Sequence, residues 1–358
     1  MRSRTLKRSP AVATPREIYE HLDRYVIGQE RAKRAIAIAA HSHLRRIQAR
    51  QEGHAGLLRK SNILMVGPTG CGKTHIARTL ASFLELPFVV VDATEYTEAG
   101  YYGKDVEVMV AELLFAANQS IQDTEKGIIF VDEIDKIARR SHGARTGAGS
   151  RDIGGEGVQQ GMLKLLEGRE VFVPLNVTQH WNKHDFVQVD TRDILFVCAG
   201  TFSDLAMYGT TARSMGFSAS DEPASTPTRR TTTKDLLDYG MIAELLGRLP
   251  VVVELGELGP EELLRILTEP PDSLVREYKE LLALDGVDLH ITQGALQEVV
   301  EYSLTRRAGA RGLRGILEEV CHDLLFDAPE RTGTRAVIDA AAVRRKLSVL
   351  DGIDLDPS

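Results

Sequence analysis

The chain has 358 residues, of which 43% are hydrophobic and 27% are charged, as is ordinary for a soluble globular protein of one large or two average domains. Its formal net charge of −7 argues against a general DNA-binding surface, and no apolar run approaches the length of a membrane-spanning helix. The three scattered cysteines form no CxxC pair, so we expect a cytoplasmic protein that holds no zinc and no disulfide framework.

The N-terminal segment, residues 1–13, carries several arginines and lysines without any acid, and we expect it to be a flexible basic tail. A helix is predicted to start directly after it, because Thr14 suits the N-cap, Pro15 the first helical position and Glu17 a capping box. A second, longer helix rich in Ala, Ile and Arg is predicted from about 30 to 51.

Residues 63–81 have the pattern of a strand, a glycine-rich turn and a helix. The turn, 67–74, fits the phosphate-binding P-loop G-x-x-x-x-G-K-[ST], in which backbone amides and the N-terminus of the next helix hold phosphate groups. Lys73 is expected to pair with the β- and γ-phosphates, and Thr74 to place its hydroxyl on Mg²⁺. The residues expected to contact the nucleotide are Gly67, Pro68, Thr69, Gly70, Cys71, Gly72, Lys73, Thr74 and His75.

A second landmark is the apolar run 128–131, which continues into two acids. This pattern predicts a buried strand with carboxylates at its C-terminal end, where ligands bind in open α/β sheets. We expect Asp132 to hold Mg²⁺ through water and Glu133 to activate or position the attacking water.

The remaining pattern up to residue 255 alternates strands and helices. Buried strands are predicted at 88–92 and 193–201, helices at 106–122 and 156–167, a mobile loop at 141–152 and disorder at 209–234. Beyond residue 255, four helices with short strands near 287–291 and 336–338 are predicted. We therefore expect an α/β domain over 14–255, with a parallel sheet flanked by helices, a small, mostly helical domain over 256–350 and a flexible tail at 351–358.

Seven motifs occur in an order that closely resembles the ClpX family of AAA+ unfoldases, and the resemblance covers about residues 14–350. They are YVIGQ at 25–29, the P-loop at 67–74, TEAGY at 97–101, VDEIDK at 131–136, GEGVQQ at 155–160, GRLPVV at 247–252 and GARGLR at 309–314. The resemblance implies a AAA+ P-loop NTPase large domain followed by a AAA+ small (lid) domain.

The resemblance also implies roles for residues outside the P-loop. Val26 and Ile27 would belong to the adenine pocket, and Thr201 to the region called sensor 1. Arg248 resembles the arginine finger that reaches the γ-phosphate of the neighbouring subunit, and Arg311 resembles sensor 2. Both suit such roles, because a guanidinium is always charged and forks across phosphate oxygens.

Three further segments resemble the parts of the family that handle substrate and peptidase. The expected pore residues are Tyr101 and Tyr102 in the first pore loop and Arg151 in the second. The expected peptidase-docking tip is Met215, Gly216 and Phe217.

The function implied is that of an ATPase that binds ATP and Mg²⁺ and, as a homohexamer, threads unfolded or tagged proteins through its pore into a ClpP-type peptidase. No peptidase activity of its own, no membrane and no nucleic acid are expected. Two alternatives stay open: a AAA+ remodeller of protein complexes that works without a protease, and a AAA+ motor that acts on nucleic acid.

Three departures from the family pattern bear on substrate choice. The four-cysteine zinc domain at the family's N-terminus is missing from this sequence, so adaptor binding through it is not expected. The family's basic pore-entrance loop aligns near 179–184 with fewer basic residues, and Tyr102 and Lys104 replace a smaller apolar residue and an acid.

Overall fold

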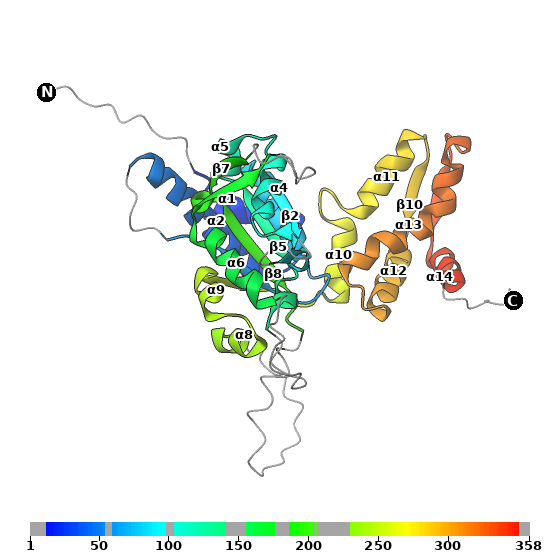
Figure 1. Ribbon diagram of the computed structural model, residues 1–358. Coiled ribbons are helices and arrows are strands. Elements are labelled where there is room, and N and C mark those ends of the chain that lie inside the picture. Colours follow the sequence, from blue (N-terminus) through cyan, green and yellow to red (C-terminus); the bar gives the residue numbers. More distant parts are fainter. Residues whose placement is uncertain are drawn as a thin grey trace, which may run out of the picture. The chain divides into compact units, whose positions relative to one another are not determined.

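The structure is a computed structural model that describes residues 12–53, 59–97, 104–139, 155–175, 186–203, 205 and 230–350. Its contacts divide the chain into two compact units (Figure 1). The first consists of the residues up to Glu20, Arg31–Pro68 and Thr74–Leu255. The second consists of His21–Glu30, Thr69–Lys73 and the chain from Gly256 onward.

A five-stranded sheet with the order β2-β5-β8-β1-β9 forms the centre of the first unit. Every neighbouring pair in it is parallel. All five strands therefore present their carboxyl ends at one edge, and the predicted parallel sheet is confirmed. The strands are β1 (Ile63–Val66), β2 (Phe88–Asp92), β5 (Ile128–Asp132), β8 (Leu195–Gly200) and β9 (Val251–Glu254).

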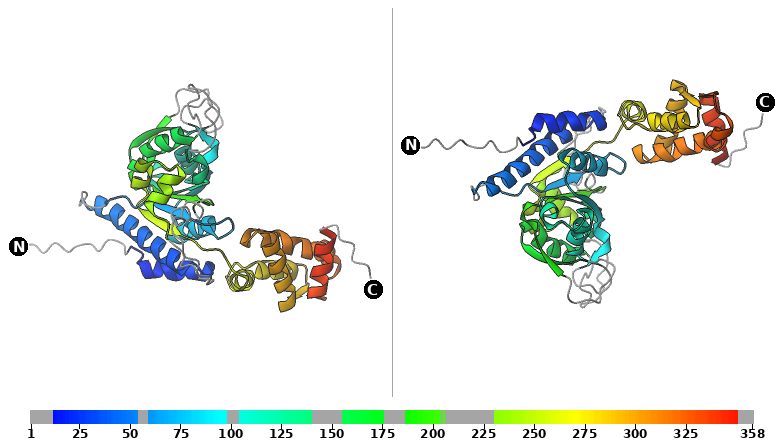
Figure 2. Two further views of the ribbon diagram at one scale, coloured as in Figure 1. Left: turned by 90° about the horizontal axis from the view of Figure 1, so that it is seen from below. Right: turned by 90° about the horizontal axis from the view of Figure 1, so that it is seen from above.

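Helices cover this sheet, and Figure 2 gives two further views of them. They are α2 (Glu30–Gln51), α3 (Lys73–Leu84), α4 (Val108–Ala116), α5 (Ile121–Thr124), α6 (Gly155–Glu167), α8 (Thr233–Tyr239) and α9 (Ala243–Arg248). Three short 3₁₀ turns connect elements: η1 (Ala93–Glu95), η2 (Ile134–Ile137) and η3 (Thr191–Asp193).

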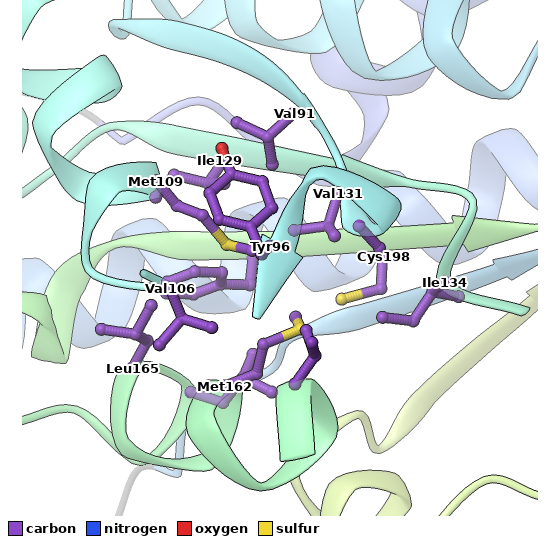
Figure 3. Packing of buried hydrophobic residues seen from close by; sticks show 14 of the residues in the cluster. Val91, Tyr96, Val106, Met109, Ile129, Val131, Ile134, Met162, Leu165 and Cys198 are labelled. Carbon is purple, nitrogen blue, oxygen red and sulfur yellow. The ribbon is translucent and has the colours of Figure 1, made fainter. Parts of the chain in front are cut away.

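The core of the first unit lies between the sheet and helices α4 and α6. Figure 3 shows side chains of this cluster, with Met162 and Leu165 contributed by α6 and Val131 and Cys198 by the sheet. Strands β1, β5 and β8 bury all or nearly all of their side chains, because helices on both faces leave no solvated side. Their apolar runs are therefore continuous rather than alternating.

The predicted start of helix α1 (Pro15–Tyr25) is confirmed in detail. The backbone N–H of Thr14 donates to Glu17 Oε2 at 2.7 Å, and the N–H of Glu17 donates back to Thr14 Oγ1 at 3.2 Å. This reciprocal pair is a capping box. The hydrogen bonds from Thr14 lower the pKa of the Glu17 carboxyl, so the cap keeps its charge at neutral pH.

The second unit has its own hydrophobic core, built mainly from helices. A two-stranded parallel sheet of β10 and β11 lies against them. The elements from residue 256 onward are α10 (Pro260–Thr268), α11 (Leu274–Leu284), β10 (Asp288–Ile291), α12 (Gln293–Thr305), α13 (Ala310–Asp327), η4 (Ala328–Glu330), β11 (Arg335–Ile338) and α14 (Ala340–Leu350).

The structure differs from the sequence-based prediction at several places. The helix predicted over 106–122 is divided into α4 and α5, because Asn118 and Gln119 have φ angles of 50° and 61°, outside the helical region. An antiparallel hairpin of β6 (Glu170–Pro174) and β7 (Phe186–Asp190) was not predicted, nor was the short pair β3 (Tyr96–Thr97) and β4 (Lys104–Asp105).

Three helices were also missed, α8, α9 and α14. Helix α8 begins at Thr233, inside the segment predicted to be disordered, because Thr232 and Asp235 form a capping box there. Residues 209–229 of that segment lie outside the described residues, as do the predicted loop 141–152, residues 1–11 of the predicted N-terminal tail and the C-terminal tail 351–358. The described helices include none that is long and apolar enough to cross a membrane.

A buried amide, Asn62, joins three elements at the amino end of the sheet. Its Nδ2 donates to the backbone oxygens of Arg248 at 3.0 Å and Leu166 at 3.4 Å, and its Oδ1 accepts from the N–H of Phe196 at 3.3 Å. Only 1% of Asn62 is exposed to solvent. The side chain thereby fixes the C-terminal ends of α6 and α9 against β8.

Replacing Asn62 with Ala should lower the free energy of unfolding by about 2–3 kcal/mol, because buried backbone groups lose their partners. Urea denaturation followed by circular dichroism would measure the change. Gln48→Ala on the surface of α2 is the matched control and should change stability by less than about 0.5 kcal/mol. Equal midpoints for the two variants would contradict the role given to Asn62.

Candidate nucleotide-binding site

The P-loop follows β1 at the carboxyl edge of the sheet. The N–H of Gly67 donates to the oxygen of Gly200 at 3.2 Å, so the loop starts beside the end of β8. Gly70 and Gly72 have φ angles of 78° and 96°, which a residue with a Cβ rarely adopts. The glycines at these two positions are therefore required by the conformation of the loop.

Lys73 and Thr74 are the first two residues of α3. Lys73 is only 8% exposed. The N-terminus of this twelve-residue helix carries a partial positive charge, which favours a phosphate group. Burial raises the pKa of the neighbouring Cys71 thiol, so Cys71 is a neutral loop residue and not a nucleophile.

Asp132 and Thr74 provide an oxygen donor set that fits Mg²⁺. Asp132 is the last residue of β5, and its Oδ2 accepts a hydrogen bond from Thr74 Oγ1 at 3.4 Å. A hydroxyl and a carboxylate at this spacing are hard oxygen ligands, and Mg²⁺ in such sites takes its other ligands from phosphate and water. The residues present therefore fit the metal that the sequence predicts.

Glu133 leaves β5 in a left-handed backbone conformation, with φ 56° and ψ 32°. Its N–H donates to Asp132 Oδ1 at 2.9 Å, which ties the two acids together. Glu133 is exposed. Glycine would adopt this backbone conformation without strain, but glycine carries no carboxylate. A non-glycine residue in this region costs about 1 kcal/mol or more, and such strain is concentrated at functional sites.

A contact that sequence analysis missed joins this turn to the end of β8. Asp135 is 4% exposed, and its Oδ2 accepts from Thr201 Oγ1 at 2.9 Å and from the N–H of Phe202 at 3.4 Å. The predicted sensor-1 residue, Thr201, is thus held by an acid two positions after Glu133. Asp135 is part of the sequence motif at 131–136, but the spacing of that motif does not predict which residue Asp135 contacts.

Arg248, the predicted arginine finger, lies elsewhere. It ends α9, three residues before the first residue of β9, and Ile63 of β1 pairs with Val251 of β9. Arg248 is therefore at the amino edge of the sheet, opposite the edge at which the P-loop begins. Its side chain is 48% exposed, and its Nη2 donates to Glu167 Oε1 at 2.9 Å.

The other predicted nucleotide residues belong to the second unit. Val26 and Ile27 are buried, with 5% and 6% exposure, so they are apolar and enclosed as an adenine pocket requires. Gln29 next to them donates to the oxygen of Gly256 at 2.9 Å and accepts from the N–H of Gly256 at 3.1 Å. Arg311 is an exposed residue in the first turn of α13.

Several predicted residues lie outside the part of the chain that the structure describes. These are the pore residues Tyr101, Tyr102 and Arg151, the docking tip Met215, Gly216 and Phe217, and the pore-entrance segment 179–184. Their roles stay predictions.

Comparison with known proteins gives consistent matches over most of the chain. Residues 58–252 match the family model for the AAA domain (Cdc48 subfamily), and residues 258–337 match that for the C-terminal, D2-small domain of ClpB protein. The chain is 48% identical over 317 residues to the ATP-dependent Clp protease ATP-binding subunit ClpX 2 of Wolinella succinogenes, covering 88% of this chain and 78% of that one.

Two further relatives carry the name ATP-dependent Clp protease ATP-binding subunit ClpX. The protein from Treponema denticola is 40% identical over 343 residues, which cover 94% of this chain and 82% of that one. The protein from Porphyromonas gingivalis is 41% identical over 344 residues, which cover 94% and 83%.

Replacing Gly200 with Ala should disturb this edge of the sheet. An added Cβ would lie 2.6 Å from the Phe202 ring and 2.8 Å from Asp135 Oδ1, so both must move. We expect a loss of about 1–3 kcal/mol in stability, together with slower ATP turnover because Thr201 shifts. Thermal melting and steady-state ATPase assays would measure both.

The matched control is Gly315→Ala in α13, where an added Cβ meets nothing within 4 Å. This variant should keep wild-type turnover and gain slight helix stability. If Gly200→Ala behaved in the same way as the control, the tight packing around Asp135 would not matter for turnover.

Proposed function

The chain belongs to the ClpX family and is a AAA+ ATPase, and we propose that it unfolds proteins and threads them through the pore of a homohexamer into a ClpP-type peptidase. The observation that carries the proposal is the gathering of Thr74, Asp132, Glu133 and Thr201 at the carboxyl ends of β1, β5 and β8. This edge has the parts of a nucleotide hydrolysis site.

Each residue at this edge has a distinct role in the proposal. The glycine-rich P-loop and the Lys73 ammonium bind the phosphates, which compensates charge that develops on the γ-phosphate. Thr74, and Asp132 through water, would hold Mg²⁺, and its charge would further stabilise the phosphate oxygens. Glu133 orients a water for attack and accepts its proton.

Action by Arg248 on a neighbouring subunit is supported by its place in the sheet. Asn62, to which the Arg248 backbone is bonded, precedes β1, whereas the P-loop follows it. The two ends of this four-residue strand are about 10 Å apart at ~3.3 Å per residue. Arg248 therefore faces away from its own P-loop and is available to the site of another copy, as expected for an arginine finger.

Substrate handling rests on the resemblance. Tyr101 and Tyr102 would grip polypeptide in the pore, since an aromatic side chain packs on many sequences. Met215, Gly216 and Phe217 would dock into the peptidase. The sequence also allows two other functions, a protease-independent remodeller and a nucleic-acid motor. A degradation assay and an ATPase assay with DNA distinguish them from the proposed function.

Replacing Glu133 with Gln should abolish turnover while the protein still binds ATP. The amide keeps the shape of the side chain but cannot accept a proton, so we expect kcat to fall about a hundredfold or more. Steady-state ATPase assays and nucleotide-binding titrations would measure the two properties. Glu330→Gln on the exposed turn η4 is the control and should be unaffected.

Degradation of a folded fluorescent reporter with an unstructured C-terminal extension, in the presence of ATP and a ClpP-type peptidase, tests the whole proposal. Wild type should degrade it, Tyr101→Ala should fail to unfold it, and Phe217→Ala should unfold it without degradation. Unfolding by wild type without degradation would favour the protease-independent remodeller. Stimulation of the ATPase by DNA but not by unfolded protein would favour the nucleic-acid motor.

A further inference from the structure

A basic cavity at the amino edge of the sheet surrounds Arg248. Its volume is about 530 Å³, and Arg59, Arg169 and Glu167 also line it. Three arginines and one carboxylate are among the residues that line it, so the cavity has an excess of positive charge. Arg59 and Arg169 had no assigned role in the sequence analysis.

Glu167 bonds two of these arginines at once. Arg248 Nη2 donates to Glu167 Oε1 at 2.9 Å, and Arg169 Nη2 donates to Glu167 Oε2 at 2.8 Å. The hydrogen bond from Arg248, and to a lesser extent that from Arg169, lowers the pKa of the Glu167 carboxyl, so Glu167 is ionised at neutral pH. Each guanidinium uses one terminal nitrogen in this contact and keeps further donors for an incoming anion.

Both arginines start from fixed backbone positions. The oxygen of Arg248 accepts from the buried Asn62 amide, and the N–H of Arg169 donates to the Oγ1 of Thr191 at 3.0 Å. Thr191 is fully buried, and its own N–H donates to the oxygen of Arg169 at 2.9 Å. The two guanidiniums are thus presented from rigid elements, although 62% of the Arg169 side chain is exposed.

The turn that separates Glu167 from Arg169 accepts only glycine. Gly168 has a φ of 87°, and an added Cβ would lie 2.8 Å from the Cα of Arg192. This turn brings Arg169 back beside the acid two residues earlier. Exposed ion pairs contribute little to stability, so the main effect of the arrangement is on the direction of the two side chains.

Lys60 also borders the cavity, but it is occupied by internal contacts. Its Nζ donates to the oxygens of Thr191 at 2.9 Å and Leu165 at 3.4 Å. Burial lowers the pKa of Lys60 to about 7, so its charge is reduced at neutral pH. The arginines therefore supply most of the positive charge that an anion would meet.

We propose that Arg169 is a second arginine that acts together with Arg248 on the phosphates of a nucleotide bound by the neighbouring subunit, with Glu167 as the positioning residue for both. The proposal rests on the function proposed above and extends it from one trans-acting arginine to a pair. A planar fork from each arginine allows four or more hydrogen bonds to phosphate oxygens. Glu167 keeps the two like-charged groups side by side before the anion arrives.

The first test compares steady-state kcat and KM for ATP in Arg169→Ala, Arg248→Ala and Glu167→Gln. Loss of one charged hydrogen-bond donor should lower kcat of Arg169→Ala about tenfold with KM for ATP unchanged, because each P-loop still binds its own ATP. Glu167→Gln should lower kcat several-fold, and Arg169→Lys should recover part of the loss. Arg265→Ala, which breaks an exposed Arg–Glu pair on α10, is the matched control and should equal wild type.

The second test uses mixed rings to separate a trans role from local stability. Subunits with Arg169→Ala have intact hydrolysis sites, and subunits with Glu133→Gln have intact arginines. Mixing them should raise turnover per intact site above that of Arg169→Ala alone, and the same should hold for Arg248→Ala. A defect confined to the folding of the Arg169→Ala subunit would not be rescued.

The outcomes distinguish this proposal from the one it rests on. If Arg248→Ala is impaired while Arg169→Ala turns over at the wild-type rate, or is impaired without rescue in mixed rings, the pairing of the two arginines is wrong and the proposed function stands. If Arg248→Ala itself has wild-type turnover, the trans role fails for both arginines.

Discussion

The hydrogen bonds of the buried Asn62 amide hold three elements of the first unit together at the amino edge of its sheet. Through them the end of α6, the end of α9 and the strand β8 are fixed at the point where β1 begins. Four residues later the same strand leads into the P-loop. One short strand therefore separates the region that binds nucleotide from the region that carries Arg248, and both depend on its register in the sheet.

The acidic residues at the end of β5 add a second constraint, at the carboxyl edge of the sheet. The left-handed conformation of Glu133 turns the chain so that Asp135 is buried against the end of β8. Asp135 then accepts a hydrogen bond from the hydroxyl of Thr201, and this bond connects the ends of β5 and β8, which are neighbours in the sheet. A shift of either strand would therefore move the turn that carries Glu133.

Much of the fold and part of the site could be predicted from the sequence, for reasons that are local. The P-loop requires glycine at positions with positive φ, and the buried strands are continuous apolar runs. Contacts between distant residues could not be predicted, because Asn62 and Arg248 are 186 positions apart and Asp135 and Thr201 are 66 apart. The β6–β7 hairpin was missed because Phe172 and Phe186 lie on its exposed face, which obscures the alternation of apolar and polar residues.

The division of the chain into units has a consequence for how the molecule can come apart. The backbone passes from one unit to the other after residues 20, 30, 68, 73 and 255. A fragment that begins at Gly256 would therefore lack two segments of its own unit, His21–Glu30 and Thr69–Lys73, and with them the Gln29 side chain that bonds Gly256.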